Sequence, residues 1–378
     1  MTAKISNNVF QIIPKGATPL SHDFNFDLLK TLCETPGVPA REEQIRTIVA
    51  KELRPLVDEL SSDTMGNVIG LKKGKPDGPR VMIAAHIDEI GFYVKHIDDK
   101  GFLRLLPVGG WDPRMMVAQR VKVTTRTGEW LRGTLMSSTK PTHLLTADEA
   151  GKGLKIEECF VDLGMSGERV KELVELGDMV TMDRTSERVG DMVVSKTLDD
   201  RVCVFVMIEA LRRLKNTAVN ANIYAVATTQ EEVGLRGATT AAYSLKPDIG
   251  IALDITLALD IPGMPEAEQV TRLGAGTAIK IHDSSLICHP KLVRHFRDVA
   301  EAKGIKYQLE MLPRGGTDAG GIQRSRGGVP SFTLSIPTRY VHTVNEMAHV
   351  EDIQATIDLL VAYLEVAHER KYDYSGDI

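Results

Sequence analysis

The sequence predicts an α/β fold, with a mixed β-sheet flanked by helices on both faces and a small β-barrel inserted into it. Continuous apolar runs, typical of strands buried on both faces, occur at residues 80–86, 222–229, 249–254 and 329–336. Amphipathic helical patterns alternate with them, at 199–214, 237–245, 291–303 and 351–370. Between residues 92 and 190 the pattern changes to short alternating runs and turns, which predicts a small β-barrel or sandwich.

Two helices, 24–33 and 41–60, are predicted before the first core strand because apolar residues recur there at helical spacing. Residues 1–23 lack the apolar core and cleavage site of a signal peptide, so we expect a short extension before the fold. The larger domain is then expected to comprise residues 24–91 and 191–378, and the insert residues 92–190. Within the insert, a helix is predicted around 167–175 and a mobile loop at 137–153.

Composition narrows the classes of function. The net charge is -5 and no Lys/Arg block dominates any segment, which argues against nucleic acid as a partner. No apolar run approaches the roughly 20 residues that cross a bilayer, so no membrane partner is expected. The four cysteines are scattered without a CxxC pair, which favours reduced packing residues in a cytoplasmic protein (Cys33, Cys159, Cys203 and Cys288).

Acidic and imidazole side chains follow several of the predicted core strands. "MIAAHIDE" ends with His86, Asp88 and Glu89, "AVATTQEE" ends with Glu231 and Glu232, and "IGIALD" ends with Asp254. "TLSIPTRYVH" reaches His342, and "VSKTLDDR" places Asp199 and Asp200 at a predicted helix start. Ligands of open α/β sheets gather at the carboxyl ends of the strands.

Each of these elements alone is commonly structural. A histidine after a strand is usually a hydrogen-bonded residue, a Glu pair is usually solvated, and Asp residues cap helix N-termini. Their joint occurrence predicts a metal site. Histidine and carboxylate ligands without thiolates suit zinc first, with cobalt or manganese as alternatives. Five ligands exceed what one catalytic zinc needs, whereas two ions about 3.5–4 Å apart that share one carboxylate would use all five.

The ordered motifs "AHIDEIG", "LDDR", "EEVGLRGA", "ALDIT", "RGGTDAG" and "RYVH" resemble those of the cytosolic tetrahedral metallo-aminopeptidases. This is the family of glutamyl, lysyl and deblocking aminopeptidases, some members of which have been labelled endoglucanases. The resemblance extends from about residue 24 to 370 and includes the insert. It implies a zinc-peptidase-like catalytic domain and two divalent metal ions per subunit.

The resemblance also implies roles for individual residues. His86, Asp199 and Asp254 would hold one metal ion, and Asp199, Glu232 and His342 the other, with Asp199 as the bridge. Asp200 is the less favoured alternative bridge, because the family pattern places the ligand at the first of the two positions.

Two further side chains receive catalytic roles from the resemblance. Glu231 would act as the general base on a water shared by the two ions and pass the proton to the leaving amine, while Asp88 would orient His86. "RYVHTVNEM" departs from the Ser-Pro that usually follows the histidine in the family, which affects the expected loop shape more than the ligand.

Substrates and assembly are likewise implied. The substrates would be short peptides with a free N-terminus. "RGGTDAGG", residues 314–321, is expected to line the substrate pocket through Gly316, Thr317 and Asp318, although a plain glycine-rich turn is an equal alternative. The insert would form dimers, six dimers would close into a homododecamer, and the loop at 137–153 would reach a neighbouring active site.

Three other functions compete with an aminopeptidase. In a glycoside hydrolase, Glu231 would pair with Asp88 or Glu232, but that chemistry needs no histidines, and the aromatic content of 5% is low for a sugar cleft. A non-catalytic assembly or peptide-binding protein conflicts with the intact set of ligands. An amidase that acts on blocked amino acids is the nearest enzymatic alternative. Among the arginines near the motifs, any could favour acidic substrates or form a structural ion pair (Arg236, Arg314, Arg324 and Arg339).

Overall fold

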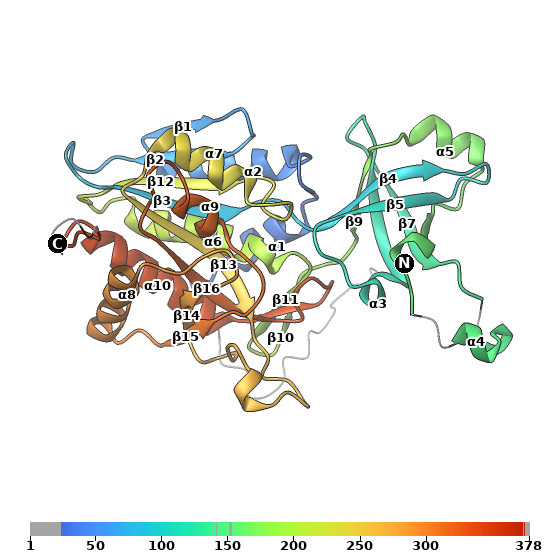
Figure 1. The fold of residues 1–378 in the computed structure, drawn as a ribbon. Coiled ribbons are helices and arrows are strands. Elements are labelled where there is room, and N and C mark those ends of the chain that lie inside the picture. The colour runs from blue at the N-terminus through green and yellow to red at the C-terminus, as the bar shows by residue number, and fades with distance from the viewer. Residues whose placement is uncertain (1–23, 141, 151–152, 373, 375–378) are drawn as a thin grey trace, which may run out of the picture.

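The computed structural model describes residues 24–140, 142–150, 153–372 and 374, and the chain forms a large α/β part and a separate small β part (Figure 1). The predicted extension 1–23 lies outside the described residues. A sheet of eleven strands forms the centre of the large part. These strands are β1 (Glu59–Ser62), β2 (Val68–Lys72), β3 (Arg80–His86), β10 (Glu187–Val189), β11 (Met192–Ser195), β12 (Asn222–Thr228), β13 (Ile249–Leu257), β14 (Thr277–His282), β15 (Tyr307–Met311), β16 (Ser331–Arg339) and β17 (Glu346–His349).

The strand order across this sheet is β1-β2-β12-β3-β13-β16-β17-β11-β10, and β14 pairs with both β16 and β15. The four central strands β12, β3, β13 and β16 run parallel to one another. Their register sets Thr228 beside His86 and Asp254 beside Ser335. The carboxyl ends of the parallel strands therefore meet at one edge, where ligands bind in open α/β sheets.

Helices cover both faces of the sheet. They are α1 (Phe26–Glu34), α2 (Glu43–Leu53), α6 (Leu198–Leu214), α7 (Arg236–Leu245), α8 (Pro290–Lys303), α9 (Asp318–Gln323) and α10 (Val350–Val366). Helices α6 and α10 pack on one face, and α7 and α9 on the other. Strand β3 meets both layers, because Val81 and Ile83 belong to the cluster around α6, whereas Met82 and Ala84 belong to the cluster around α7. Its continuous apolar sequence follows from burial on both faces.

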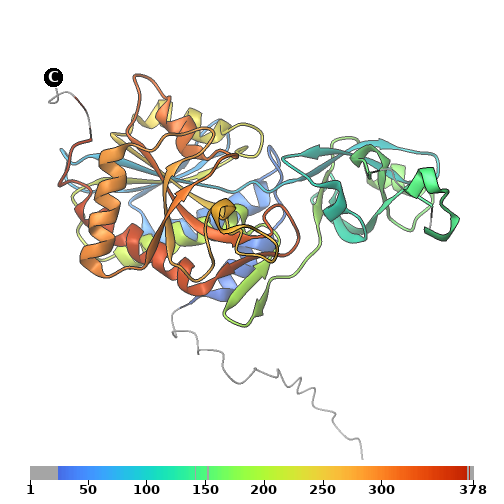
Figure 2. The ribbon, with the colours of Figure 1, turned by 60° about the horizontal axis from the view of Figure 1, so that its bottom comes forward.

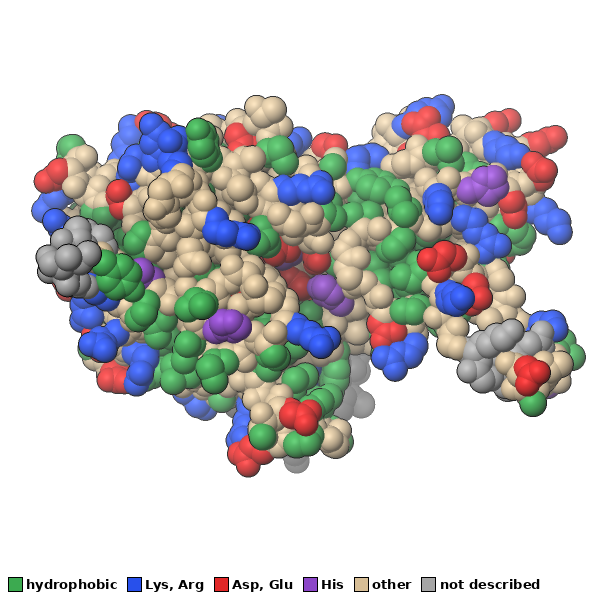
Figure 3. Space-filling model, viewed as in Figure 1, with side chains coloured by type: hydrophobic (Ala, Val, Ile, Leu, Met, Phe, Trp, Pro, Cys, Tyr) green, Lys and Arg blue, Asp and Glu red, His purple; other side chains and the backbone are tan. Residues whose placement is uncertain are grey.

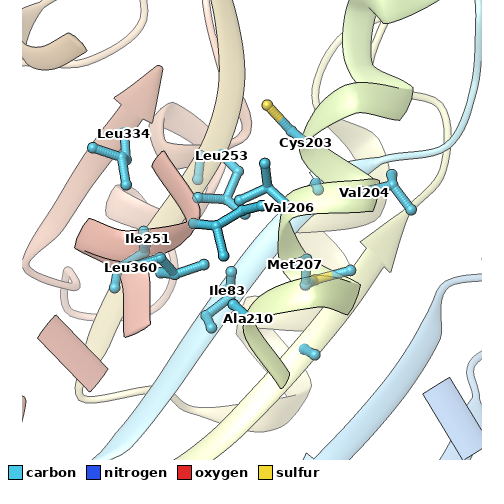
Figure 4. Packing of buried hydrophobic residues seen from close by; sticks show 14 of the residues in the cluster. Ile83, Cys203, Val204, Val206, Met207, Ala210, Ile251, Leu253, Leu334 and Leu360 are labelled. Carbon is cyan, nitrogen blue, oxygen red and sulfur yellow. The ribbon is translucent and has the colours of Figure 1, made fainter. Parts of the chain in front are cut away.

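The main hydrophobic core fixes α6 against the centre of the sheet. Figure 4 shows Val206 and Met207 of α6 close to Ile83 of β3 and Ile251 of β13. Each of these side chains is almost fully buried, and burying an aliphatic side chain contributes roughly 1.5–3 kcal/mol. This packing sets the N-terminus of α6, and with it Asp199, at a fixed position relative to the end of β3.

The small part is a closed six-stranded barrel in the order β4-β5-β8-β7-β6-β9. Its strands are β4 (Gly91–Ile97), β5 (Leu103–Val108), β6 (Gln119–Thr124), β7 (Trp130–Ser137), β8 (Cys159–Asp162) and β9 (Met179–Met182), accompanied by the helices α3 (Pro113–Met116) and α5 (Gly167–Leu173). Buried Phe92, Val121 and Val180 pack in its own hydrophobic core. The barrel projects from the α/β part (Figure 2), and the predicted α/β fold with an inserted β-barrel is confirmed.

After the barrel the chain returns to the large sheet before residue 191, because β10 pairs with β11, and β11 with β17. The segment predicted as a loop at 137–153 contains two short helical turns, Thr142–Leu144 and Ala147–Ala150, while residues 141, 151 and 152 lie outside the described part. Across the described ranges, no helix combines the length and hydrophobicity required to cross a bilayer.

Several predicted elements of the large part were wrong or incomplete. The helix predicted at 41–60 ends at Leu53, is followed by the 3-10 turn Arg54–Leu56, and gives way to β1, because Pro55 cannot continue an α-helical ladder. Strands β1, β2, β10, β11, β14, β15 and β17 were not predicted. β1 is polar and mostly exposed at the edge of the sheet, so it lacks the apolar run by which the central strands were recognised.

Candidate metal centre

A cavity of about 590 Å³ lies at the carboxyl ends of the parallel strands. All five expected metal ligands and the expected general base line it, namely His86, Asp199, Glu231, Glu232, Asp254 and His342. In the space-filling view, acidic side chains and a histidine lie together in a recess near the junction with the barrel (Figure 3). Residues from separate strands and one helix therefore form one site.

Asp199 lies between two imidazoles. Its Oδ1 is 3.1 Å from Nε2 of His86, and its Oδ2 is 3.1 Å from Nε2 of His342. His86 ends β3, His342 follows β16 in a turn, and Asp199 belongs to the first turn of α6. Both Asp199 and His86 are buried. One carboxylate thus joins three segments that are distant in the sequence.

The turn after β12 separates the two adjacent glutamates. The backbone N–H of Glu231 donates to Oδ1 of Asp88 and that of Glu232 to Oδ2, both at 3.0 Å. Oε2 of Glu231 then lies 3.9 Å from Nε2 of His86, whereas Oε1 of Glu232 lies 3.6 Å from Nε2 of His342. The neighbouring carboxylates therefore face different imidazoles.

Hydrogen bonding fixes the orientation of the His86 ring. Its Nδ1 lies 3.1 Å from the carbonyl oxygen of Asp88 and 3.5 Å from Oδ1 of the same residue. Because a carbonyl oxygen can only accept, Nδ1 bears the proton, and in the neutral ring the lone pair of Nε2 faces Asp199. A lone pair beside a carboxylate requires a proton or a metal cation between them.

Both histidines have raised pKa values. Burial alone lowers the pKa of His86, but Glu231, Asp199 and Asp88 raise it well above its ordinary value. Burial also opposes protonation of His342, yet Asp199 and Glu232 raise its pKa to about 10. The site therefore attracts positive charge to the positions of both imidazoles.

Most of the carboxylates at the site have raised pKa values, which favours their neutral, protonated form. Burial raises the pKa of Glu231 well above its usual range, and it raises the pKa of Glu232 to about 7, helped by Asp199. Burial, with Asp199 next, raises the pKa of Asp254. Asp199 is the exception, because its bonds to His342 and His86 outweigh burial and lower its pKa. Without metal ions, negative charge at the site exceeds the positive charge available.

The donor atoms fit divalent cations. In each of two groups the ligand atoms lie within 4.8 Å of one another, and the groups are His86, Asp199 and Glu232, and His86, Asp200 and Asp254. Oε1 of Glu232 and Oδ1 of Asp200 are buried without a hydrogen-bond partner. Buried carboxylate oxygens are costly unless a proton or cation pairs with them. Asp200, the alternative bridge, is thus close to Asp254, and its Oδ2 accepts a bond of 3.1 Å from the backbone N–H of His86.

One buried carboxylate next to the site was missed from the sequence. Oε1 of Glu346 accepts from the backbone N–H of His342 at 2.8 Å, and Oε2 accepts from that of Asp199 at 3.0 Å. Burial raises the pKa of Glu346 to about 8. The local signal is a glutamate four residues after His342, which alone indicates no function.

The expected substrate stretch forms one wall of the cavity. Gly316 and Thr317 line it. The hydroxyl of Thr317 donates to Oδ2 of Asp283 at 3.0 Å, so this oxygen is engaged in the interior. Asp318 is buried beside the cavity and accepts a 2.5 Å bond from the hydroxyl of Thr228. The backbone, rather than these side-chain oxygens, forms the accessible part of the wall.

The barrel contributes a turn to the site. Gly110 lines the cavity, and a Cβ at this position would lie 3.3 Å from Nδ1 of His342. Gly109 has a φ of +81°, and a Cβ there would approach Oε2 of Glu232 to 3.2 Å and Ile90 more closely still. Both the left-handed conformation and the close approach favour glycine at Gly109.

Of the four arginines considered in the sequence, Arg314 lines the cavity. The other three bond elsewhere, since Arg236 donates to Gln230, Arg324 to the carbonyl of Gly320, and Arg339 to Asp260. Among the described residues, Arg314 has no hydrogen bond or ion pair. Apart from Thr256, the rest of the wall is apolar, with Leu235, Ile255, Leu257, Leu312 and Val341.

Fold and site together define a hydrolase of the peptidase class. The family model described as M42 glutamyl aminopeptidase matches residues 66–359, and the chain belongs to this family. The resemblance drawn from the motifs is confirmed.

Relatives match over almost the whole chain. A putative aminopeptidase of Acetivibrio thermocellus is 42% identical over 89% of this chain and 97% of its own length. The lysyl aminopeptidase of Pyrococcus furiosus is 37% identical over 90% and 97%. The glutamyl aminopeptidase of Lactococcus lactis is 31% identical over 86% and 92%.

Three solved structures are similar in fold and sequence. An aminopeptidase of the archaeon Desulfurococcus kamchatkensis has a TM-score of 0.85 and 41% identity, and the match covers 90% of this chain and 94% of that one. The TET1 peptidase of Pyrococcus horikoshii, described as able to assemble into a tetrahedron or a large octahedral shell, has a TM-score of 0.80 and 30% identity over 90% and 98%. A Thermotoga maritima protein labelled endoglucanase has 0.74 and 28% over 90% and 97%.

Proposed function

We propose that this protein is an aminopeptidase that uses two divalent metal ions to remove N-terminal residues from short peptides. The observation that supports this best is the position of Asp199, which presents one carboxylate oxygen to each of two histidines at 3.1 Å. A carboxylate with one oxygen toward each of two imidazoles suits a bridge between two ions in a paired-metal site.

His86, Asp199 and Asp254 hold one ion in this proposal, and Asp199, Glu232 and His342 hold the other. The distances from Nε2 of His342 to Asp199, 3.1 Å, and to Glu232, 3.6 Å, support the second set. The compact groups of ligand atoms divide differently, since one joins Glu232 to His86 and Asp199, and the other joins Asp254 to His86 and Asp200. Asp200 lies close enough to Asp254 to contribute to the first ion or to shape its pocket. The His and carboxylate donors favour zinc, with cobalt or manganese as alternatives.

When bound, the two ions supply positive charge that polarises the peptide carbonyl and lowers the pKa of an attacking water. Glu231 is the proton carrier of the proposal: it accepts the proton of that water and delivers it to the leaving amine. Its carboxylate lies 3.9 Å from His86 and lines the cavity. Asp88 is a positioning residue, because it binds the backbone N–H of Glu231 and contacts the Nδ1 side of the His86 ring.

The substrate enters the same cavity with its free N-terminus. An ammonium group is favoured beside the clustered carboxylates, whereas an acetylated N-terminus offers no positive charge. The backbone of Gly316 offers contacts along one wall, where a Cβ would meet Ser285 at 2.9 Å, and the apolar wall receives the first side chain. Arg314 favours an acidic first side chain, because its guanidinium has no competing partner among the described residues.

Self-association is part of the proposal. The similar peptidase of Pyrococcus horikoshii is described as able to assemble into a tetrahedron or a large octahedral shell, and another similar structure is described as a dodecamer. We extend this to dimers through the barrel of residues 92–190 and to a homododecamer. The four buried free cysteines are compatible with the proposed cytoplasmic location.

A glycoside hydrolase is the competing activity, since a similar structure bears an endoglucanase label. Sugar clefts usually present aromatic rings for stacking. Among the described residues that line the cavity, none is a Phe, Tyr or Trp. The aminopeptidase therefore fits the cavity better.

The deciding experiment compares aminoacyl-anilides with their N-acetylated forms. The purified protein is loaded with Zn²⁺ or Co²⁺, and release of the anilide is measured before and after exhaustive chelation. Hydrolysis of only the free-amine substrates, lost on chelation and restored by metal, is expected. Equal rates on the acetylated substrates would instead identify an amidase, and full activity after chelation would refute the metal site.

A further inference from the structure

Glu346 and two proposed metal ligands, His342 and Asp199, contact one another in a closed ring. The carboxylate accepts from the backbone N–H of His342 at 2.8 Å and from that of Asp199 at 3.0 Å. The side chains of the same two residues meet on the other side, with Nε2 of His342 3.1 Å from Oδ2 of Asp199. Each residue is therefore held at its backbone by Glu346 and at its side chain by the other.

The two backbones need an outside partner because both depart from regular structure. His342 has a φ of +61°, in the left-handed region that non-glycine residues seldom adopt. Asp199 has φ and ψ of -74° and 102°, which are not helical although it lies in the first turn of α6. Neither N–H joins a regular ladder, because His342 lies beyond the end of β16 and the N–H groups of the first turn of a helix have no intrahelical acceptor, and Glu346 satisfies both.

The position of Glu346 is itself rigid. It begins β17, where it is paired with Ser195 of β11, and its side chain is 2% exposed. It lines a small void together with Asp199, Glu232 and His342, on the barrel side of the main cavity. A sheet strand therefore anchors the carboxylate that holds the two ligand-bearing segments.

We infer that Glu346 is a positioning residue of the metal centre, which sets the separation of Asp199 and His342 and thereby the affinity for the ion that they share. This inference rests on the proposed function. Glu346 itself binds no ion; it acts through the backbones of the two ligands. Removing partners of this outer kind typically lowers metal affinity by about 10- to 100-fold.

Glu346→Gln tests the inference with little change of volume. A carboxamide has one acceptor oxygen and one NH₂ donor, so one of the two backbone N–H groups would face another donor whichever way the amide is turned. Co²⁺ is titrated into the metal-free full-length protein by calorimetry, with its visible absorption as a second readout. We expect at least one of the two Co²⁺ affinities to fall by about 10- to 100-fold.

Asp352→Asn is the matched control. Asp352 is 1% exposed and likewise accepts two backbone bonds, from Gly274 and Gly276 at 2.7 Å each, but it touches none of the proposed ligands. Both variants lose one acceptor of a buried carboxylate, so both should melt at a lower temperature. Only Glu346→Gln should weaken Co²⁺ binding, while Asp352→Asn should stay within about two-fold of the wild type.

Glu346→Asp provides a second variant that keeps both acceptor oxygens, and its Co²⁺ affinity is expected to lie between those of wild type and Glu346→Gln. Co²⁺ affinities of Glu346→Gln and Glu346→Asp within two-fold of wild type would overturn the inference, as would an equal loss in Asp352→Asn. If Glu346→Gln does not fold, the Co²⁺ affinity of Glu346→Asp is the test. A loss of Co²⁺ affinity of at least three-fold supports the inference, and a smaller loss refutes it. A wild type that binds two Co²⁺ ions but cleaves no peptide would refute the proposed function instead.

Discussion

Asp88 holds the backbone of Glu231 by a 3.0 Å hydrogen bond from the N–H of Glu231 to Oδ1. The second oxygen of Asp88 binds the next N–H, that of Glu232, at the same distance. A single buried carboxylate therefore fixes the turn in which two adjacent glutamates diverge, one toward His86 and the other toward His342. This divergence permits a different role for each of them.

Glu231→Gln should retain both metal ions and lose about 10²- to 10⁴-fold in kcat, because the amide cannot accept the proton of the attacking water. Glu232→Gln is the matched control and should instead lose metal, since it replaces an oxygen that faces His342. Metal content by elemental analysis and anilide kinetics separate the two variants. Wild-type kcat in Glu231→Gln would exclude it as the general base.

Asp199→Asn should prevent binding of a full pair of ions and lower activity by more than about 100-fold, because one of the two oxygens that face the imidazoles becomes a donor. Replacing His342 with alanine should remove one ion and leave the other. The number of ions bound is measured by titration of the metal-free protein. Asp178→Asn is the control: it changes a buried carboxylate of the barrel part and should keep two ions. Two bound ions in Asp199→Asn would contradict the proposal that Asp199 bridges the two ions.

Arg314→Ala should reduce kcat/KM by about 10- to 100-fold for glutamyl-anilide and little for leucyl-anilide, because a charged hydrogen bond is worth about 1.5–3 kcal/mol. Since Arg314 is exposed, added salt should weaken the preference for glutamyl-anilide in the wild type. Arg326→Ala is the control, because Arg326 stacks on Tyr243 and does not line the cavity. Equal losses on both anilides would show that Arg314 does not select acidic residues.

We expect the protein to lose stability in acid because of His295. Burial, with Arg370 next, lowers its pKa to about 4, below the ordinary value of 6.5. Between these values the unfolded chain binds more protons than the folded one, so the contribution of neutral His295 is complete above pH 6.5 and is lost as the pH falls toward 4. The shift corresponds to at most roughly 3 kcal/mol.

The measurement is the free energy of unfolding of wild type and His295→Gln at several pH values. Loss of packing against Tyr363 and Tyr372 lowers the stability of the variant by an amount that does not depend on pH. The difference between the two proteins should therefore shrink from pH 8 to pH 5. A constant difference over this range would contradict the lowered pKa.

The sequence alone determined the parallel centre of the fold and the cluster at its edge. Strands β3, β12, β13 and β16 are buried on both faces, so their residues form continuous apolar runs, and the polar residues after them must share one edge of the sheet. His86, Glu231 and Asp254 could be selected for this reason, because each follows or ends such a run. The inserted barrel was recognised because the apolar pattern changes to short alternating runs between residues 92 and 190.

Only the tertiary structure decided which groups meet across distant segments. Gly109 and Gly110 approach the site because the turn after β5 of the barrel lies at the cavity, and Glu346 reaches it through contacts with two backbone N–H groups. Such contacts depend on the path of the chain and leave no periodic pattern in the sequence. Arg314 likewise has no partner among the described residues because of how distant segments pack. The edge strand β1 pairs with its neighbour β2 and was missed because it is polar and mostly exposed.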